Sequence, residues 1–196
     1  CELSAHTLQA FLPQQAVLGA SWNIAESASI NADLTWIDWS AYENPTAVTK
    51  ATLTIEPPPQ FPVELPGDVA PTRVDDPNFA DRIVPRLGVE YFLPDFTNSA
   101  GIAIARVPVR VGYVYELSPI PEQTGDSNFV DADRHTLSFG VGVGVVPLGL
   151  TLDGHAAVSL LPERETRKRS PYDLVGDYTQ EGQMVSVGVT LGGHFE

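Results

Sequence analysis

The segment HTLSFGVGVGV, residues 135–145, alternates two kinds of side chain without interruption. Its odd positions carry large, mostly apolar side chains, and its even positions carry threonine, serine or glycine. Because successive side chains of a β-strand point to opposite faces, the pattern predicts a strand with one apolar face and one small, polar face. The same alternation recurs in segments 16–23, 30–36, 86–91, 106–115, 150–159 and 185–195. The sequence therefore predicts an all-β, antiparallel fold.

Composition excludes several classes of function. The chain has 25 Asp and Glu against 11 Lys and Arg, and its net charge of −14 argues against a nucleic-acid partner. A single cysteine, Cys1, allows no disulfide within the chain and no cysteine-based metal site. No serine stands in a nucleophile motif and no histidine pair has metal-ligand spacing, so we expect no enzyme activity, no catalytic residue, no metal and no cofactor. No apolar run reaches the length of a transmembrane helix.

Two architectures use strands of this kind. A soluble sandwich turns the apolar face inward, whereas an outer-membrane barrel turns it toward lipid. The barrel is favoured by long alternating runs, by a second face rich in Gly, Ser, Thr and Arg that suits a lumen, and by aromatic residues near the strand ends. The expected aromatic girdles are Trp22, Tyr91 and Phe195 at one level and Trp36, Tyr113 and Tyr115 at the other.

Turn signals divide the chain into about seven transmembrane strands. The expected strands are 15–24, 29–55, 81–93, 101–116, 134–146, 148–160 and 183–195, and the second of them has a break near Asn44 and Pro45. Short turns at 23–29, 94–101 and 145–149 alternate with long loops at 56–80, 118–134 and 161–183. Bacterial barrels have short periplasmic turns, long outer loops and an even number of strands. Seven strands therefore predict that residues 1–196 are part of an outer-membrane barrel and not the whole of it.

A family resemblance points the same way. The matching motifs are Arg86, Gly88, Glu90 and Tyr91; Gly112, Tyr113 and Tyr115; Ser118, Pro119 and Pro121; and the run Asp131, Ala132, Asp133, Arg134 and His135. Together with FLPQQAVLGASW (11–22) and DLTWIDWSAY (33–42), they resemble the C-terminal half of the long-chain fatty acid outer-membrane transporters, which are FadL-type proteins and include aromatic-hydrocarbon uptake channels.

The resemblance implies a larger barrel of about 14 strands in the bacterial outer membrane. It also implies that residues 1–196 are the C-terminal portion of one outer-membrane β-barrel domain. It also implies passive uptake of hydrophobic molecules such as long-chain fatty acids or aromatic hydrocarbons. The expected partners are the remaining strands of the barrel (from the same or another chain), outer-membrane lipid and lipopolysaccharide, and a hydrophobic small-molecule ligand.

Five charged residues are expected on the lumen face of two adjacent strands: Arg82, Arg86, Glu90, Arg106 and Arg110. A hairpin centred near residues 96–97 would place Arg86 near Arg110 and Glu90 near Arg106. Arginine forks pair well with carboxylates, so these residues could form a basic rung that receives the head group of a fatty acid. Alternatively they form a structural charge ladder with Asp33, Asp153 or acids of a plug.

Glycines make up the rest of the expected ligand-binding set. Gly140 and Gly142 face the predicted lumen, as do Gly144, Gly188 and Gly192 on the same and another strand. Since glycine weakens a strand through backbone entropy, its repeated use needs a benefit. It provides room for a plug or an apolar ligand, or it merely suits local curvature and close backbone approach.

Other functions remain open at this stage. The barrel could be non-conducting and anchor an outer-membrane assembly. A soluble, acidic β-sandwich that acts as a binding module is the third alternative. The charged segment 163–170 is expected in an outer loop, where it binds lipopolysaccharide phosphate or is simply solvated.

Overall fold

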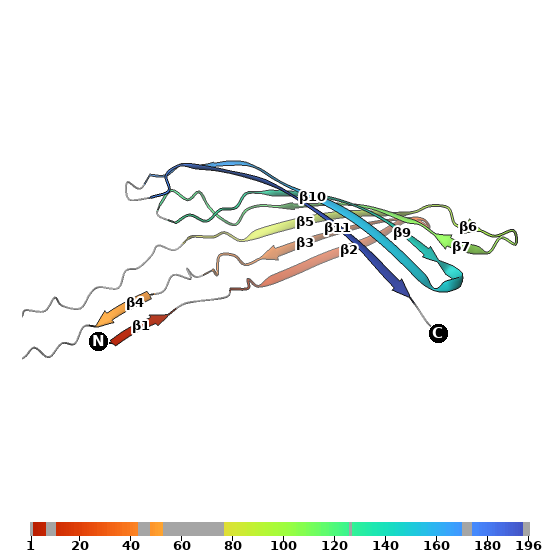
Figure 1. Cartoon of the computed structure of the whole chain (residues 1–196), viewed down its shortest axis with the longest axis horizontal. Coiled ribbons are helices and arrows are strands. Elements are labelled where there is room, and N and C mark those ends of the chain that lie inside the picture. Colours follow the sequence, from red (N-terminus) through yellow and green to blue (C-terminus); the bar gives the residue numbers. More distant parts are fainter. Residues whose placement is uncertain are drawn as a thin grey trace, which may run out of the picture.

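The computed structural model describes residues 2–6, 11–42, 48–52, 77–125, 127–169 and 174–193, and their main feature is one long, curved antiparallel sheet (Figure 1). Seven long strands lie in the sheet in chain order: β2 (Gln15–Ala25), β3 (Ala28–Ile37), β5 (Arg82–Phe92), β8 (Pro108–Glu116), β9 (Arg134–Val145), β10 (Leu150–Thr166) and β11 (Tyr178–Gly193). Each pairs with the next, so the topology is an up-and-down meander. The predicted all-β, antiparallel fold is confirmed.

Four short strands complete the described structure. β1 (Glu2–His6) and β4 (Val48–Thr52) form a separate two-stranded sheet. β6 (Phe96–Thr97) pairs with β7 (Ala103–Arg106), which also pairs with β9. A single 3₁₀ turn, Val146–Leu148, joins β9 to β10 and ends at Gly149, whose φ of 61° is the left-handed conformation that glycine adopts without strain. None of the described residues forms a helix long and apolar enough to cross a membrane.

The predicted strand 29–55 is wrong as a single strand. β3 ends at Ile37, and a turn follows in which Tyr42 donates its backbone N–H to Trp39 O over 3.0 Å. The backbone N–H of Ser40 is held by Asp81 Oδ1 at 2.9 Å, so a carboxylate from the start of β5 fixes this turn. β4 then pairs with β1 and not with the long sheet. The expected break at residues 44–45 lies outside the described residues.

The loop expected at 161–183 is also shorter than predicted. β10 continues to Thr166 and β11 begins at Tyr178, with one irregularity in their pairing between Leu161 and Arg164. Both faces of these strand ends carry polar residues, so the two-residue alternation disappears from the sequence although the backbone pairing continues. The expected strand 101–116 is divided into β7 and β8 at Val107.

The register of β5 against β8 corrects the expected neighbours. Glu90 lies opposite Arg110 and Arg86 opposite Val114, so Arg86 is not beside Arg110 and Glu90 is not beside Arg106. The connection between the two strands contains the β6–β7 pair and turns at Gly101, where φ is 76°. This turn is centred several residues later than the sequence suggested, and the pairing shifts with it.

The two faces of the sheet differ in an unusual way. Among the described residues, only two hydrophobic side chains are buried, Val84 and Ala132. The large side chains of the alternating pattern are exposed instead; Leu18 is 76% exposed and Val187 79%. On β9, the large residues Phe139, Val141 and Val143 are exposed, whereas Gly140 and Gly142, which alternate with them, are buried. We name the side with the large apolar residues the apolar face and the side with the glycines and charges the polar face.

The long sheet is open. β2 and β11 are its two ends, and neither has a second neighbour among the described strands. They are 11 and 16 residues long, so each presents a long row of backbone N–H and C=O groups at an edge.

Candidate functional site

Most of the predicted site residues lie on the polar face, along strands that cross the middle of the sheet. The register places five residues in one row, which we name the central row: Glu90, Arg110, Gly140, His155 and Gly188, on β5, β8, β9, β10 and β11. Alternation of side chains along each strand brings all five to the same face. The sequence predicted the face correctly but not which of these residues are neighbours.

Arg110 is the most connected residue of the central row. Its Nε donates to Glu90 Oε2 over 2.5 Å, and its Nη1 donates to Asp153 Oδ1 over 2.7 Å. Glu90 is on the adjacent strand, whereas Asp153 is on β10, with β9 lying between. The guanidinium therefore bridges two carboxylates, as the fork of an arginine side chain allows.

Glycines on β9 make the longer of these two bridges possible. A Cβ at Gly142 would collide with the carboxylate of Asp153 and would lie 3.1 Å from Pro108 Cγ. A Cβ at Gly140 would lie 3.6 Å from Arg110 Cβ and 3.9 Å from His155 Cβ. The space that Gly142 leaves is therefore occupied by Asp153. Glycine at this position therefore allows the side chains of Arg110 and Asp153 to meet across β9.

The same principle applies to the neighbouring strand. A Cβ at Gly188 would collide with the imidazole of His155, so this ring lies across β11. A Cβ at Gly192 would lie 2.6 Å from Thr151 Oγ1. Polar side chains of β10 thus lie flat over the glycines of the strands on either side.

Arg86 makes a second charged contact on the polar face. Its Nη1 lies 2.9 Å from Asp33 Oδ1 and 2.5 Å from Thr35 Oγ1, so β5 is linked to β3. Both charged side chains are partly exposed. Asp33 and Asp153 are the two acids of the chain that the charge-ladder alternative named, and both are paired with the predicted arginines.

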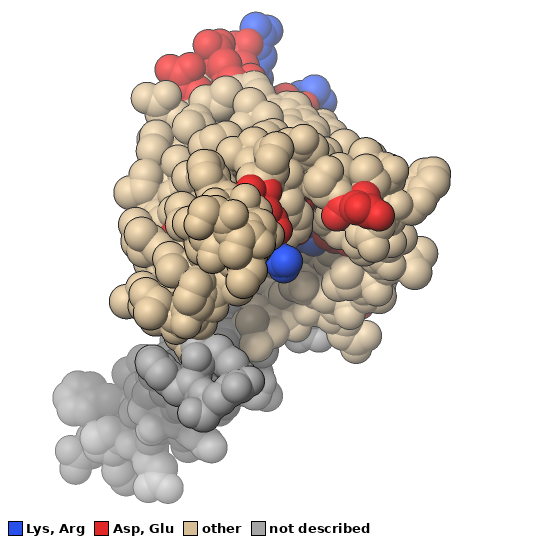
Figure 2. Space-filling view, turned by 90° about the vertical axis from the view of Figure 1, so that its right-hand side faces the viewer, with Lys and Arg blue, Asp and Glu red and all other residues tan. Residues whose placement is uncertain are grey.

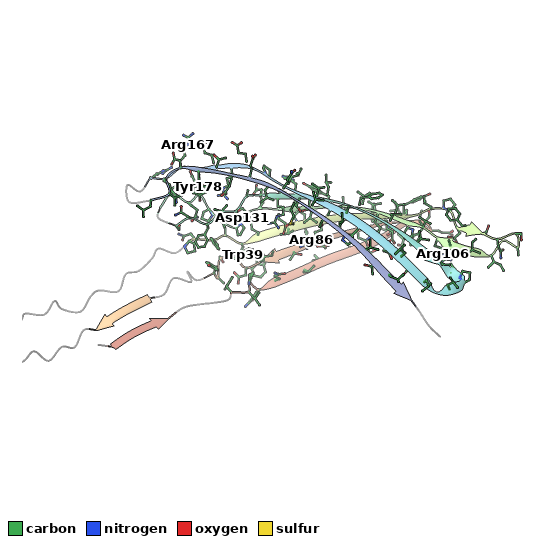
Figure 3. The ribbon with its side chains drawn as sticks, in the orientation of Figure 1. Trp39, Arg86, Arg106, Asp131, Arg167 and Tyr178 are labelled. Carbon is green, nitrogen blue, oxygen red and sulfur yellow. The ribbon has the colours of Figure 1, made fainter. Side chains whose placement is uncertain are left out.

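The other two arginines lie away from the central row. Arg82 Nε donates to Ser118 O over 2.7 Å at one end of the sheet. Arg106 Nε lies 3.4 Å from Asp95 Oδ2 near the β6–β7 end, far along the sheet from Arg86 (Figure 3). The four arginines therefore do not form one basic rung, and each has a carboxylate or a carbonyl partner.

A hollow of about 540 Å³ lies on the polar face beside the Glu90–Arg110 pair. Its lining comprises three glycines, which we name its floor, together with five polar and three apolar residues: Gly88, Gly112 and Gly140; Asn31, Glu90, Arg110, Ser138 and His155; and Val89, Val111 and Phe139. A Cβ at Gly88 would meet no side chain within 4 Å, so glycine at this position leaves open space.

Only part of this hollow was predicted as a site. Glu90, Arg110 and Gly140 belong to the expected ligand-binding set, whereas Gly88, Gly112 and Ser138 do not. Gly88, Gly112 and Ser138 each stand between two large residues of the alternating pattern. Small residues elsewhere in the chain, for example in the segment 185–191, stand in the same pattern. Their sequence pattern therefore gives no signal that separates the hollow from the rest of the polar face.

The long-loop end of the sheet is held by basic side chains of the β10–β11 hairpin. Arg164 Nη1 donates to Ser118 Oγ and Asp131 O over 3.2 and 3.1 Å, and its Nη2 donates to Ile120 O over 2.8 Å. Lys168 Nζ donates to Gly125 O and Ser127 O over 2.9 and 2.6 Å. Two cations of the segment 163–170 are thus engaged with the loop between β8 and β9.

The same hairpin carries one highly exposed ion pair. Arg167 Nε lies 2.9 Å from Glu165 Oε1, and the Arg167 side chain is 71% exposed. The hydrogen bond from Arg167 to Glu165 raises the pKa of Arg167 above its ordinary value. Figure 2 views the molecule from the opposite end, on the β6–β7 side, and most of the surface seen there is uncharged.

An aromatic cluster at the long-loop end was not predicted from the sequence. Its members are Phe11, Trp39, Tyr42, Phe79 and Phe129, which come from four separate segments of the chain. Tyr42 stacks on Phe79 with ring centroids 4.7 Å apart, and Phe129 meets Phe79 edge-on at 5.1 Å. No local sequence pattern predicts contacts between residues so far apart along the chain.

No metal site is present in the described part of the chain, since no three His, Cys, Asp or Glu side chains group around one point there. In comparisons with known proteins, no family model and no curated sequence matched this chain.

Proposed function

We propose that this chain forms part of the wall of a bacterial outer-membrane β-barrel that takes up hydrophobic molecules passively. The observation that carries the proposal is the exposure of the apolar face, together with the small number of buried hydrophobic side chains among the described residues. Each large apolar side chain left in water forgoes about 1.5–3 kcal/mol of burial free energy. Lipid removes this cost for the apolar face as a whole.

The soluble sandwich accounts poorly for the same surface. In a sandwich, a second sheet covers the apolar face, and none of the described segments does so. The apolar residues on neighbouring strands form a continuous exposed area, for example Leu137, Phe139 and Val141 on β9 beside Leu152 and Val158 on β10. Soluble monomers rarely expose large contiguous apolar patches.

Strand length and aromatic placement also support a membrane wall. β2 and β5 each have 11 residues and β9 has 12, and a tilted transmembrane strand needs about 9–11 residues. Trp22 and Tyr91 lie near one end of their strands and are exposed on the apolar face. Trp36 lies near the opposite end, where Tyr113 and Tyr115 also approach the loops. Phe195 lies outside the described residues.

The open edges of β2 and β11 support the inference that further strands complete the barrel. Within lipid every backbone polar group needs a partner, so a free strand edge is not tolerated there. The rest of the same protein or a second chain is proposed to supply these strands. That residues 1–196 are the C-terminal portion of the barrel domain rests on the family resemblance alone. The remaining proposed contacts are outer-membrane lipid along the apolar face and lipopolysaccharide at the long-loop end.

The experiment has two parts. Membrane fractionation of the native cells should recover the intact protein in the outer membrane, and unheated samples should migrate differently from heated ones in SDS gels, as folded barrels do. Cells that lack the protein should then take up a labelled hydrophobic compound more slowly than cells in which it is restored. Recovery of a stable, detergent-free soluble protein would contradict the barrel itself.

A non-conducting barrel that anchors an assembly is the second candidate. The ion pairs that cross the polar face favour it, because such a network rigidifies the wall without requiring any ligand. Outer-membrane recovery combined with normal uptake in cells that lack the protein would favour this structural role over the channel.

A further inference from the structure

We infer that the polar face selects uncharged hydrophobic molecules and disfavours ligands with a carboxylate, and that Glu90 and Asp153 set this preference through Arg110. The inference rests on the proposed channel function and names the class of molecule that the channel admits. The basic rung expected from the sequence would have favoured the opposite class, the anionic fatty acids.

The positive charge near the hollow is already neutralised. Arg110 is the arginine that lines the hollow, and Glu90 and Asp153 occupy its Nε and Nη1 at hydrogen-bond distance. A ligand carboxylate that reached its remaining nitrogen would bring a third negative charge next to these two. Like charges so close together disfavour the ionised form of each, which weakens anion binding.

The charged residues around the hollow also carry a net negative charge. Asp33, Glu90 and Asp153 are paired with only two arginines, Arg86 and Arg110, so these five residues carry a net charge of −1. Arg82 and Arg106 lie at other places along the sheet and have partners of their own. Arg106 is paired with Asp95, whereas the partners of Arg82 are the neutral carbonyls of Ser118 and Asp81. Arg82 does not line the hollow, so within the hollow the predicted set offers only the doubly paired Arg110 to an anionic head group.

The shape of the hollow suits an uncharged ligand. The three glycines Gly88, Gly112 and Gly140 contribute no side chains to it, although Ser138 lies over Gly112. Its volume of about 540 Å³ accommodates a ring or several methylene groups. Asn31 and Ser138 at its walls can form neutral hydrogen bonds. A charged ligand in this hollow would lose part of its own hydration without gaining a compensating ion pair.

The test compares binding of two probes that differ in the charge of their head group. Hexadecanoate and hexadecan-1-ol compete for a fluorescent hydrophobic reporter on the intact protein extracted in detergent from its native membrane. At pH 8 we expect the alcohol to bind at least about tenfold more tightly than the carboxylate. Raising the ionic strength should narrow this ratio, because salt screens the repulsion.

Two variants test the residues. Asp153→Asn and Glu90→Gln each remove one carboxylate from Arg110, and each should shift the ratio toward the carboxylate by about tenfold. Glu165→Gln is the matched control, since it removes a carboxylate from the remote Arg167 pair and should leave the ratio unchanged. A difference in migration between heated and unheated samples in SDS gels shows which variants are folded. One folded variant of the two is enough to test the inference.

The outcomes separate this inference from the proposed function. Equal or tighter binding of hexadecanoate by the unmodified protein overturns the inference but leaves the channel in place. An unchanged ratio in a folded Asp153→Asn or Glu90→Gln protein also overturns it. Absence of binding and uptake for both probes overturns the channel function, and the inference with it.

Discussion

Arg110 Nη1 and Asp153 Oδ1 are 2.7 Å apart although a whole strand, β9, lies between the strands that carry them. Neighbouring strands are about 4.8 Å apart, so two side chains from strands on either side of β9 span about 10 Å. They meet because Gly142 leaves the surface of β9 flat. One ion pair therefore links β8 and β10 without a direct backbone contact between them.

Replacing Gly142 with valine should break this link. The new Cβ would occupy the place of the Asp153 carboxylate, and we expect a loss of about 1–3 kcal/mol in the free energy of unfolding. Urea unfolding of the detergent-solubilised protein measures the change. Gly182→Val is the control, since a Cβ at Gly182 meets nothing within 4 Å and the position is also in a strand. Equal stability of the two variants would contradict the clash.

Placing an arginine on the apolar face discriminates a membrane wall from a soluble sheet. Val187 is 79% exposed, so Val187→Arg should change the stability of a soluble protein little. In a bilayer the same substitution should cost up to about 2–4 kcal/mol, depending on its depth. Unfolding from lipid vesicles measures this cost. Val175→Arg, at an exposed position outside the strands, should have almost no effect.

Alternation and turn signals together were sufficient to predict seven long antiparallel strands, although not all of their bounds. Alternation failed wherever both faces become polar, as in the extension of β10 to Thr166. It also could not give the register of β5 against β8, because the β6–β7 pair lies in their connection. The Arg110–Asp153 contact depends on two registers at once, so the sequence could indicate Asp153 as a possible partner but could not assign it to Arg110.

Acidification should loosen the turn after β3. The backbone N–H of Ser40 donates to Asp81 and is the main cause that lowers the pKa of this carboxyl below its ordinary value of 3.8. Because folding favours the ionised form of Asp81, the contact adds stability at pH values above the pKa of Asp81 in the unfolded chain. That stability is lost as the pH falls through the lowered pKa of the folded state.

Asp81→Asn tests this pH dependence. The variant should be less stable than the unmodified protein at neutral pH, and the difference should shrink as the pH falls below 3.8. Unfolding curves at a series of pH values between neutrality and the acid limb provide the comparison. Trp36 Nε1 donates to Asp81 Oδ2 over 3.2 Å, so indole fluorescence offers a local signal. A difference in stability that is constant with pH would contradict the prediction.

Removing Arg164 should release the loop between β8 and β9. Its side chain makes three hydrogen bonds to that loop, and bonds to a charged donor contribute about 1.5–3 kcal/mol each, which predicts at least about tenfold faster local amide exchange in Arg164→Gln. Hydrogen exchange followed by mass spectrometry on peptides that cover residues 118–131 measures the rate. Arg167→Gln should leave these peptides unchanged, because Arg167 pairs with Glu165 on its own hairpin. Similar amide exchange rates in Arg164→Gln and Arg167→Gln would contradict the prediction and would mean that other contacts order the loop.

The meander has a consequence for how such a wall can change its size. Each long strand pairs with the next one along the chain, and no long strand has to cross another to reach its place. A whole hairpin could therefore be duplicated or deleted without reversing the direction of any remaining strand. In a closed wall, such an event would widen or narrow the circumference by two strands while every turn and loop stayed on its own side of the membrane.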